Sequence, residues 1–302
     1  MKTHITPCGK SDARITITGN DGETLAAASL WWNDTPIHEG NPIGTIGDFH
    51  ALSAEATHRL LETAATHLRE NGASIAIGPM DGNTWKKHRF VIETNGRPPF
   101  LLEPENPPEY PDWWREAGFS ELSRYSSSIV PLDGSTTVPP ALKQRILSSG
   151  VSIEPLVPAR FEDELRAIHS LSLKSFANNF LYTLLPEGDF LEAYLKIRAC
   201  VDPDLVKLAR KNGAIAGFVF GIPDLADASK PALIVKTLAV DPAAGTAGLG
   251  SLLVDELHLT GCRKGYTEAI HALQHGSNTS LKITGRHHGT AFRRYALFSK
   301  IL

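Results

Sequence analysis

Cysteine is scarce in this 302-residue chain, with only Cys8, Cys200 and Cys262. Their number is odd, they are far apart, and no Cys-x-x-Cys pair occurs. This pattern argues against a disulfide framework or a cysteine-built zinc site, and it is typical of a reducing compartment. The first ten residues hold no apolar stretch that would serve as a signal peptide. We therefore expect a soluble, cytoplasmic protein.

Long apolar runs and a strong charge of one sign are also missing. No stretch of about 18 apolar residues occurs, so we expect no transmembrane helix and no membrane partner. The 30 basic and 33 acidic residues give a net charge of −3, which argues against general binding to nucleic acids. We expect no metal site either, because the adjacent His287 and His288 would point apart on a regular element and lie at the surface.

The length predicts two domains, at about 100–200 residues each. The sequence PLDGSTTVPP, which begins at Pro131, is rich in turn formers, and Pro139-Pro140 cannot continue a regular element. We therefore expect a first domain at residues 1–132, a linker at 133–150 with a short helix at 141–148, and a second domain at 151–302.

Hydrophobic periodicity gives the two halves a similar order of elements. In the second domain it predicts helices at 159–175, 186–199 and 248–264, and strands at 151–155, 204–209, 215–222, 232–240, 267–273 and 294–302. In the first domain it predicts a hairpin at 14–18 and 24–32, a strand at 42–51, a helix from a Ser53 cap to Asn71, and strands at 74–77 and 123–130. The predicted fold class is α/β (α+β), with a mixed, mostly antiparallel central sheet flanked by helices in each domain.

One segment of the second domain has the features of an anion site. A strand ends at Val240, Asp241-Pro242 stops it, and Gly248-Leu249-Gly250 opens an amphipathic helix. The first amides of a helix lack intrahelical acceptors, the helix dipole favours anions there, and glycines let a phosphate approach the backbone. The segment lacks Gly-Lys-Ser/Thr and a full Gly-x-Gly-x-x-Gly, which disfavours triphosphate and dinucleotide sites. A simple tight turn is the alternative.

This order of elements, with Asn278 after the next strand, resembles the GNAT acyltransferase superfamily over the whole second half. The family signature Gln/Arg-x-x-Gly-x-Gly/Ala matches here with Gly245 in place of the basic or amide residue. The resemblance implies that backbone amides hold the pyrophosphate of acyl-CoA, at Gly245, Thr246, Ala247, Gly248, Leu249, Gly250 and Ser251. It also implies that Leu238, Ala239 and Val240 splay from the next strand to bind the pantetheine arm, and that Asn278 contacts that arm or caps a helix.

The activity that this resemblance implies is transfer of an acyl group to an amine. The donor would be acetyl-CoA or another acyl-CoA, the acceptor a small-molecule primary amine that attacks directly in a ternary complex, and no metal would take part. Tyr295 would protonate the leaving thiolate, or would simply pack under the last strand. Ser280 could also face the thiol. No carboxylate precedes Asp241 on the cofactor strand, so His275 or His271 would be the base, with burial as the alternative for His271.

The first domain resembles a second, degenerate GNAT unit. Its strand-to-helix junction at residues 48–53 has no glycine pair and begins with Asp48, so we expect no CoA binding there. The chain would act as a monomer or homodimer. A catalytically weak or inactive acyl-CoA sensor or interaction module is the alternative function. Transfer from a charged tRNA is disfavoured by the acidic net charge.

Overall fold

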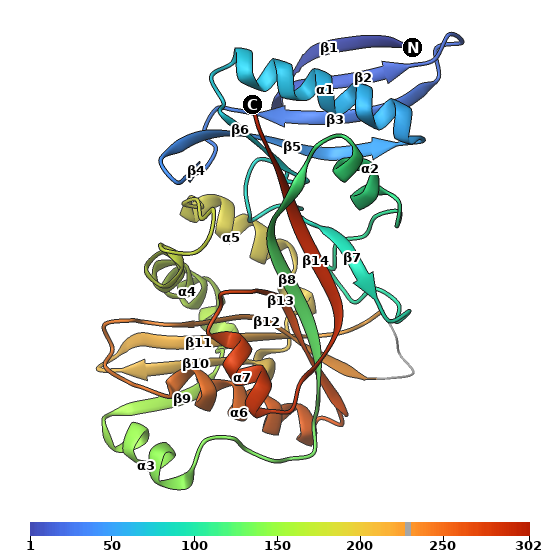
Figure 1. The fold of residues 1–302 in the computed structure, drawn as a ribbon. Coiled ribbons are helices and arrows are strands. Elements are labelled where there is room, and N and C mark those ends of the chain that lie inside the picture. The colour runs from blue at the N-terminus through green and yellow to red at the C-terminus, as the bar shows by residue number, and fades with distance from the viewer. Residues whose placement is uncertain (227–230) are drawn as a thin grey trace.

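The computed structural model describes residues 1–226 and 231–302. Its strands form one continuous sheet in the order β1-β2-β3-β5-β6-β14-β8-β13-β12-β11-β10-β9, with β4 beside β5 and β7 beside β14. Figure 1 shows two long strands, β8 in green and β14 in red, running between the N-terminal half, with its blue strands β1, β2 and β3, and the C-terminal half, with its orange strands β12 and β13. The predicted fold class is therefore confirmed, with the two sheets fused into one.

The N-terminal half runs from β1 to β8. Its strands are β1 (Lys2–Cys8), β2 (Ser11–Thr18), β3 (Thr24–Trp31), β4 (Ile37–His38), β5 (Asn41–Ala51), β6 (Ile75–Gly78), β7 (Phe90–Thr94) and β8 (Ser120–Pro131). Its helices are α1 (Ala54–Glu70) and α2 (Tyr110–Glu116). Helix α1 packs on β2, β3 and β5, and the hydroxyl of Ser53 accepts a hydrogen bond from the amide of Ala56 at 3.2 Å. This cap confirms the predicted start of the helix.

The linker helix α3 (Pro140–Ser148) leads to the C-terminal half. That half contains β9 (Val151–Pro155), α4 (Phe161–Phe176), α5 (Glu187–Lys196), β10 (Val206–Lys211), β11 (Ala214–Pro223), β12 (Ala232–Val240), α6 (Leu249–Arg263), β13 (Glu268–His275), α7 (Ser280–Arg286) and β14 (Thr290–Ile301). Single 3-10 turns lie at Pro158–Arg160, Arg198–Cys200 and Pro203–Leu205. No helix among the described residues is both long and apolar enough to cross a bilayer.

The two halves exchange their closing strands. Strand β8 belongs to the N-terminal half in sequence but pairs with β13, from Glu268↔Pro131 to His275↔Tyr125. Strand β14 ends the chain but pairs with β6 of the N-terminal half, and it also pairs with β7 and β8. The domain boundary at residues 133–150 remains a prediction, and strands from both sides of this boundary pair within the same sheet.

Helices α4 and α6 cover opposite faces of the C-terminal sheet. Phe218 and Phe220 of β11 lie in one core cluster with α4, and Ala216 and Val219 lie in another with α6. Glycines on β11 let α6 approach closely, because a Cβ at Gly217 would lie 3.1 Å from Leu253 of α6. This close packing fixes where α6 begins relative to the end of β12.

Candidate functional site

Strands β12 and β13 separate part-way along their length. They pair in parallel only from Ala232↔Glu268 to Val235↔His271. Beyond that point β12 continues to pair with β11 on its other side, as far as Gly217↔Val240. The backbone of residues 236–240 therefore has one edge that no strand covers. This is the divergence that the resemblance implied around Leu238, Ala239 and Val240.

Irregularities in both strands lie at the level of the split. The pairing of β12 with β11 shifts between Thr237↔Phe220 and Val235↔Gly221, which leaves Lys236 as an extra residue. On β13, Leu273 has a positive φ of 55°. Neighbouring residues of a regular strand point to opposite faces, so only one of Lys236 and Thr237 would be expected to line the cleft, but both line it. The bulge is the reason, since an extra residue breaks the alternation of faces.

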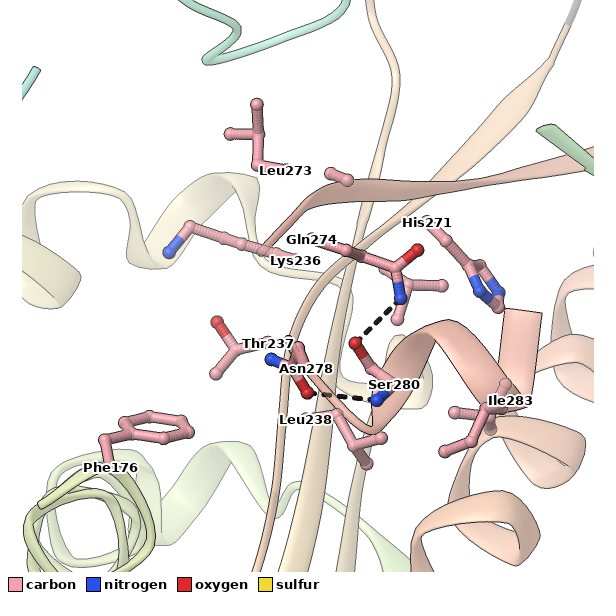
Figure 2. Close-up of a pocket in the computed structure, with 13 residues that line it drawn as sticks. Phe176, Lys236, Thr237, Leu238, His271, Leu273, Gln274, Asn278, Ser280 and Ile283 are labelled. Atoms are coloured by element: carbon pink, nitrogen blue, oxygen red, sulfur yellow. Dashed lines mark hydrogen bonds between the residues drawn. The ribbon is translucent and has the colours of Figure 1, made fainter. Parts of the chain in front are cut away.

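A cavity of about 170 Å³ occupies the gap between the strands. It is lined from β12, β13, α4, α6 and α7, by Phe176, Val235, Lys236, Thr237, Leu238, Val254, His271, Ala272, Leu273, Gln274, Asn278, Ser280 and Ile283. Figure 2 shows the β12 side chains Thr237 and Leu238 across from Ser280 and Ile283 of α7. Seven of these residues are apolar and six are polar, so the walls combine apolar surface with groups that can bind a polar part of a small molecule.

The N-terminus of α6 lies at the end of β12. Gly248 precedes the helix with a φ of 92° and no side-chain cap. The amide of Leu249 donates to Thr246 O at 3.1 Å and that of Leu252 to Gly248 O at 3.0 Å, whereas no acceptor within the described residues is recorded for the amides of Gly250 and Ser251. Free amides at a helix start form a site for an anion.

Two basic side chains lie beside this helix start. Arg286, exposed at the end of α7, donates to Ser251 Oγ at 3.0 Å. The ammonium group of Lys211 donates to Ala244 O, in the loop before α6, at 3.1 Å. Gly245 replaced the basic residue of the family signature, and these side chains bring positive charge to the same place from other elements.

The corresponding junction in the N-terminal half lacks these features. Ser53 caps α1, so one of its first amides already has an acceptor. Asp48 forms an ion pair with Arg14, and its amide donates to Asp81 Oδ1 at 2.7 Å. That the N-terminal half does not bind CoA stays a prediction. Its physical reason is that the Ser53 hydroxyl already occupies an amide at the start of α1, which a phosphate would otherwise bind.

His271 lies in a buried group of histidines. It is 3% exposed, its Nε2 lies 3.0 Å from His258 Nε2, and its Nδ1 lies 2.7 Å from Thr284 Oγ1. Burial lowers the pKa of His271 to about 3 and that of His258 to about 2. His271 lines the cavity, but both of its ring nitrogens already have partners, which matches the predicted alternative of a buried, hydrogen-bonded histidine.

His287 corrects the prediction that the His287–His288 pair lies at the surface. His288 is exposed, but His287 is 6% exposed and its ring centroid lies 4.5 Å from that of His258. Its Nε2 is 3.1 Å from Asp255 Oδ1, without hydrogen-bond alignment. Asp255 also accepts from the amide of Val138 at 2.9 Å, which ties the linker to α6. Among the described residues, no group of three or more His, Cys, Asp or Glu is arranged to hold a metal ion.

The other predicted catalytic residues lie outside the cavity lining. His275 ends β13, half-buried, with Nε2 at 2.7 Å from Ser123 Oγ and its ring stacked on Phe180 at 5.2 Å; burial lowers its pKa. Tyr295 is fully buried, and its hydroxyl contacts Ser127 Oγ at 2.9 Å and donates to Glu103. Burial and then the charge of Glu103 raise the pKa of Tyr295.

Sequence reasoning gave no role to Gln274 and suggested only that Ser280 could face the thiol. Gln274 Nε2 donates to Ser280 Oγ at 2.8 Å, and Asn278 Oδ1 accepts from the Ser280 amide at 3.0 Å, both drawn in Figure 2. Asn278 thus lines the cavity and also orders the start of α7, so both of its predicted roles are open to it. In the sequence, the feature that pointed to Ser280 as a site residue was its position two residues after Asn278.

Comparison with solved structures shows the class of fold. The chain aligns over 97% of its length with a GCN5-related N-acetyltransferase from Sphaerobacter thermophilus, at 15% identity and a TM-score of 0.55, covering 81% of that chain. It aligns over 96% with a tandem GNAT protein from the clavulanic acid biosynthesis pathway, at 12% identity and a TM-score of 0.52, covering 82% of that chain. The fold is therefore that of tandem GNAT proteins.

Further likenesses are more distant or partial. The glucosamine N-acetyltransferase region of a fungal multi-domain β-N-acetylglucosaminidase matches at 13% identity and a TM-score of 0.58, over 95% of this chain and 33% of that one. Among curated proteins, Protein YghO of Escherichia coli and the bacterial ceramide synthase of Caulobacter vibrioides are each 23% identical, over 63% of this chain. The chain spans about half the length of these two relatives, 49% and 50%. No family model matches the sequence.

Proposed function

We propose that the chain is an acyl-CoA-dependent N-acyltransferase that moves acetyl from acetyl-CoA to a primary amine of a small molecule. The observation that carries the proposal is the split between β12 and β13 after Val235↔His271, with the uncapped start of α6 at the end of β12. The split between the strands leaves a free backbone edge for the extended, amide-containing pantetheine arm, and the start of α6 offers free backbone amides to the phosphates.

The residues present fit such a donor. The amides of Gly250 and Ser251 would hold the pyrophosphate, with Arg286 and Lys211 adding charge. The open backbone edge of residues 236–239 would bind the pantetheine arm as an added strand, while Val240 O accepts a hydrogen bond from Ser175 Oγ at 2.9 Å. The thioester end would then lie in the cavity, with the acyl group between Phe176 and Leu238.

The volume of the cavity favours a short acyl group. It measures about 170 Å³, close to the roughly 150 Å³ of an apolar cavity that accommodates benzene. That space suits acetyl or a similarly small group.

The amine acceptor must lose a proton when it attacks the thioester. Of the two predicted bases, His275 is the one that water reaches, because it is half-buried while His271 is buried. The amide of Ser277 donates to His275 Nδ1 at 3.2 Å, so the neutral ring carries its proton on Nε2, next to Ser123 Oγ. The hydroxyl of Ser277 lies 2.8 Å from Nδ1, and water must replace it when Nδ1 takes a proton. We propose that His275 takes the amine proton through water, acting as a base with a pKa below that of a free histidine.

An acyl-CoA-binding sensor with little turnover is the second candidate. It is favoured by one observation, that no carboxylate lies among the residues lining the cavity. Both candidates need the same donor site, so they differ only in turnover. We propose that a monomer or homodimer acts in the cytoplasm, without nucleic acid or membrane as a partner.

Calorimetric titration of CoA and acetyl-CoA tests the donor site. A Cβ at Gly250 would lie 3.6–3.7 Å from Val240, Ile283 and Leu238, so Gly250→Glu would put a carboxylate at the mouth of the cavity beside the phosphates. We expect micromolar binding to wild type and a loss of about a hundredfold or more in the variant, about 3 kcal/mol. Gly188→Glu is the control, because Gly188 is also in the first turn of a helix, α5, with open space around it.

Two results decide the proposal. Failure of wild type to bind either compound would refute the donor site for enzyme and sensor alike. Binding without thiol release, across a library of small amines, would leave the sensor. Acetyl-, butyryl- and palmitoyl-CoA compared at one fixed amine would show whether the cavity limits chain length, with palmitoyl-CoA expected to be the poorest donor.

A further inference from the structure

A chain of hydrogen-bonded side chains runs from the core to the cavity. His258 Nε2 lies 3.0 Å from His271 Nε2, and His271 Nδ1 lies 2.7 Å from Thr284 Oγ1. Thr284 Oγ1 then donates to Gln274 Oε1 at 2.9 Å, and Gln274 Nε2 donates to Ser280 Oγ at 2.8 Å. All but Ser280 are buried, so this is an ordered polar path beneath the cavity wall.

The chemistry of these groups gives the chain one direction. The single hydroxyl proton of Thr284 goes to Gln274 Oε1, or to Ser280 O at 3.2 Å, both of which can only accept. Thr284 must therefore accept from Nδ1–H of His271. The Nε2 of neutral His271 then accepts, and His258 donates to it. Each member donates toward the cavity, and the last, Ser280, accepts from Gln274 and keeps its own proton free.

Ser280 is held where that proton faces the ligand space. Its amide is fixed by Asn278 Oδ1 at 3.0 Å, and its side chain lines the cavity across from Leu238. No acceptor for its hydroxyl proton is recorded within the described part of the chain. Hydrogen bonds in series polarise one another, which strengthens the last donor.

We propose that Ser280 is a catalytic residue that donates a hydrogen bond to the sulfur of the departing CoA, and that Gln274, Thr284, His271 and His258 are positioning residues for it. This inference rests on the proposed function. In the step, the amine nitrogen forms a bond to the thioester carbonyl carbon, and the carbon–sulfur bond breaks with its electron pair going to sulfur. The proton that the amine loses reaches the sulfur through water, so amide and free thiol are the products and atoms balance.

The role is donation and not net proton transfer. A thiol has a pKa of about 8.5, and an aliphatic hydroxyl is a much weaker acid, so Ser280 would not give up its proton to a thiolate. A fixed donor nevertheless stabilises negative charge as it develops on sulfur, which lowers the barrier without changing its own protonation.

The same hydrogen bond would stabilise the thiolate of bound CoA, and this can be measured without knowing the amine. The probe is CoA bound to the full-length protein, with thiolate followed by ultraviolet absorbance as pH rises. A hydrogen bond to a charged group would shift the thiol pKa by about one to two units. We expect Ser280→Ala to raise the pKa of the bound thiol by that amount with an unchanged CoA affinity. Ser280→Thr should restore it, because it keeps the hydroxyl.

Two further variants separate donation from general damage. Gln274→Leu removes the donor to Ser280 Oγ without adding a charge, and we expect it to raise the thiol pKa by part of the shift seen in Ser280→Ala. Ser152→Ala, at an exposed position on β9, should leave the pKa of the bound thiol unchanged. An unchanged thiol pKa in Ser280→Ala would overturn the role of Ser280 while leaving the donor site intact. Absence of CoA binding to wild type would instead remove the proposed function, and this inference with it.

Discussion

The buried histidines His258 and His271 should make stability depend strongly on pH. Each is 3% exposed, and burial lowers their pKa values to about 2 and about 3. A histidine in the unfolded chain titrates near 6.5. Between pH 6.5 and about 3, the unfolded state therefore binds protons that the native state does not, so stability is lost as pH falls through this window.

The size of the effect follows from the unfolded pKa alone, as long as both rings stay neutral when folded. Lowering the pH from 7.5 to 5 should cost about 2 kcal/mol for each histidine and about 4 for the pair. A domain is commonly stable by only about 5–15 kcal/mol, so the loss should be plain. Asp255 and His287, which pack beside His258, would reduce it if they shared a proton with the pair.

Urea unfolding at pH 7.5, 6.5, 5.5 and 5, followed by the fluorescence of the five tryptophans, measures this loss. His258→Gln removes one of these rings, so the drop between pH 7.5 and 5 should fall by about 2 kcal/mol. Burial also lowers the pKa of His88 to about 3, and its contribution is the same in wild type and variant. His4→Gln, at an exposed position, should leave the drop unchanged. Equal stability of wild type at pH 7.5 and 5 would show that the histidines are protonated in the fold, and the neutral chain beneath the cavity would be refuted.

Two predictions concern single side chains. Arg286→Ala should weaken CoA binding about tenfold and make it less dependent on salt, because a phosphate of CoA loses one neighbouring cation. Calorimetry at two ionic strengths measures this, with Arg69→Ala as the exposed control. Equal CoA affinities of Arg286→Ala and wild type would show that Arg286 is not part of the site. Tyr295→Phe should cost about 1–3 kcal/mol of stability, because Glu103 loses a buried donor, with CoA affinity and turnover kept. A collapse of turnover with the fold intact would instead support the role of acid that the sequence assigned to Tyr295.

Local patterns in the sequence predicted most elements, because helices and half-buried strands leave a periodicity that needs no partner. Strand Ala232–Val240 was predicted at its observed bounds, and helix α6 within one residue at each end. Strand β1 was missed because it is an edge strand whose residues are mostly exposed on both faces, so no alternation marks it. Strand β7 was missed within a stretch that looks like a loop.

Features that depend on distant partners could not be predicted in the same way. Gly248 and Gly250 at the start of α6 could be identified from the sequence, because what they do depends on the conformation of their own backbone and not on distant residues. The link between Gln274 and Ser280, the reach of Arg286 to Ser251, and the burial of His287 each depend on how α7 packs against α6 and β13. The bulge at Lys236 depends on register with β11, which periodicity within one strand does not reveal.

The exchange of β8 and β14 gives the chain the pairing of a strand-swapped dimer joined into one polypeptide. Residues 1–132 carry β8 but lack β14, which pairs with β6, and residues 151–302 carry β14 but lack β8, which pairs with β13. Neither half can complete its sheet alone, so the two should unfold in one cooperative step.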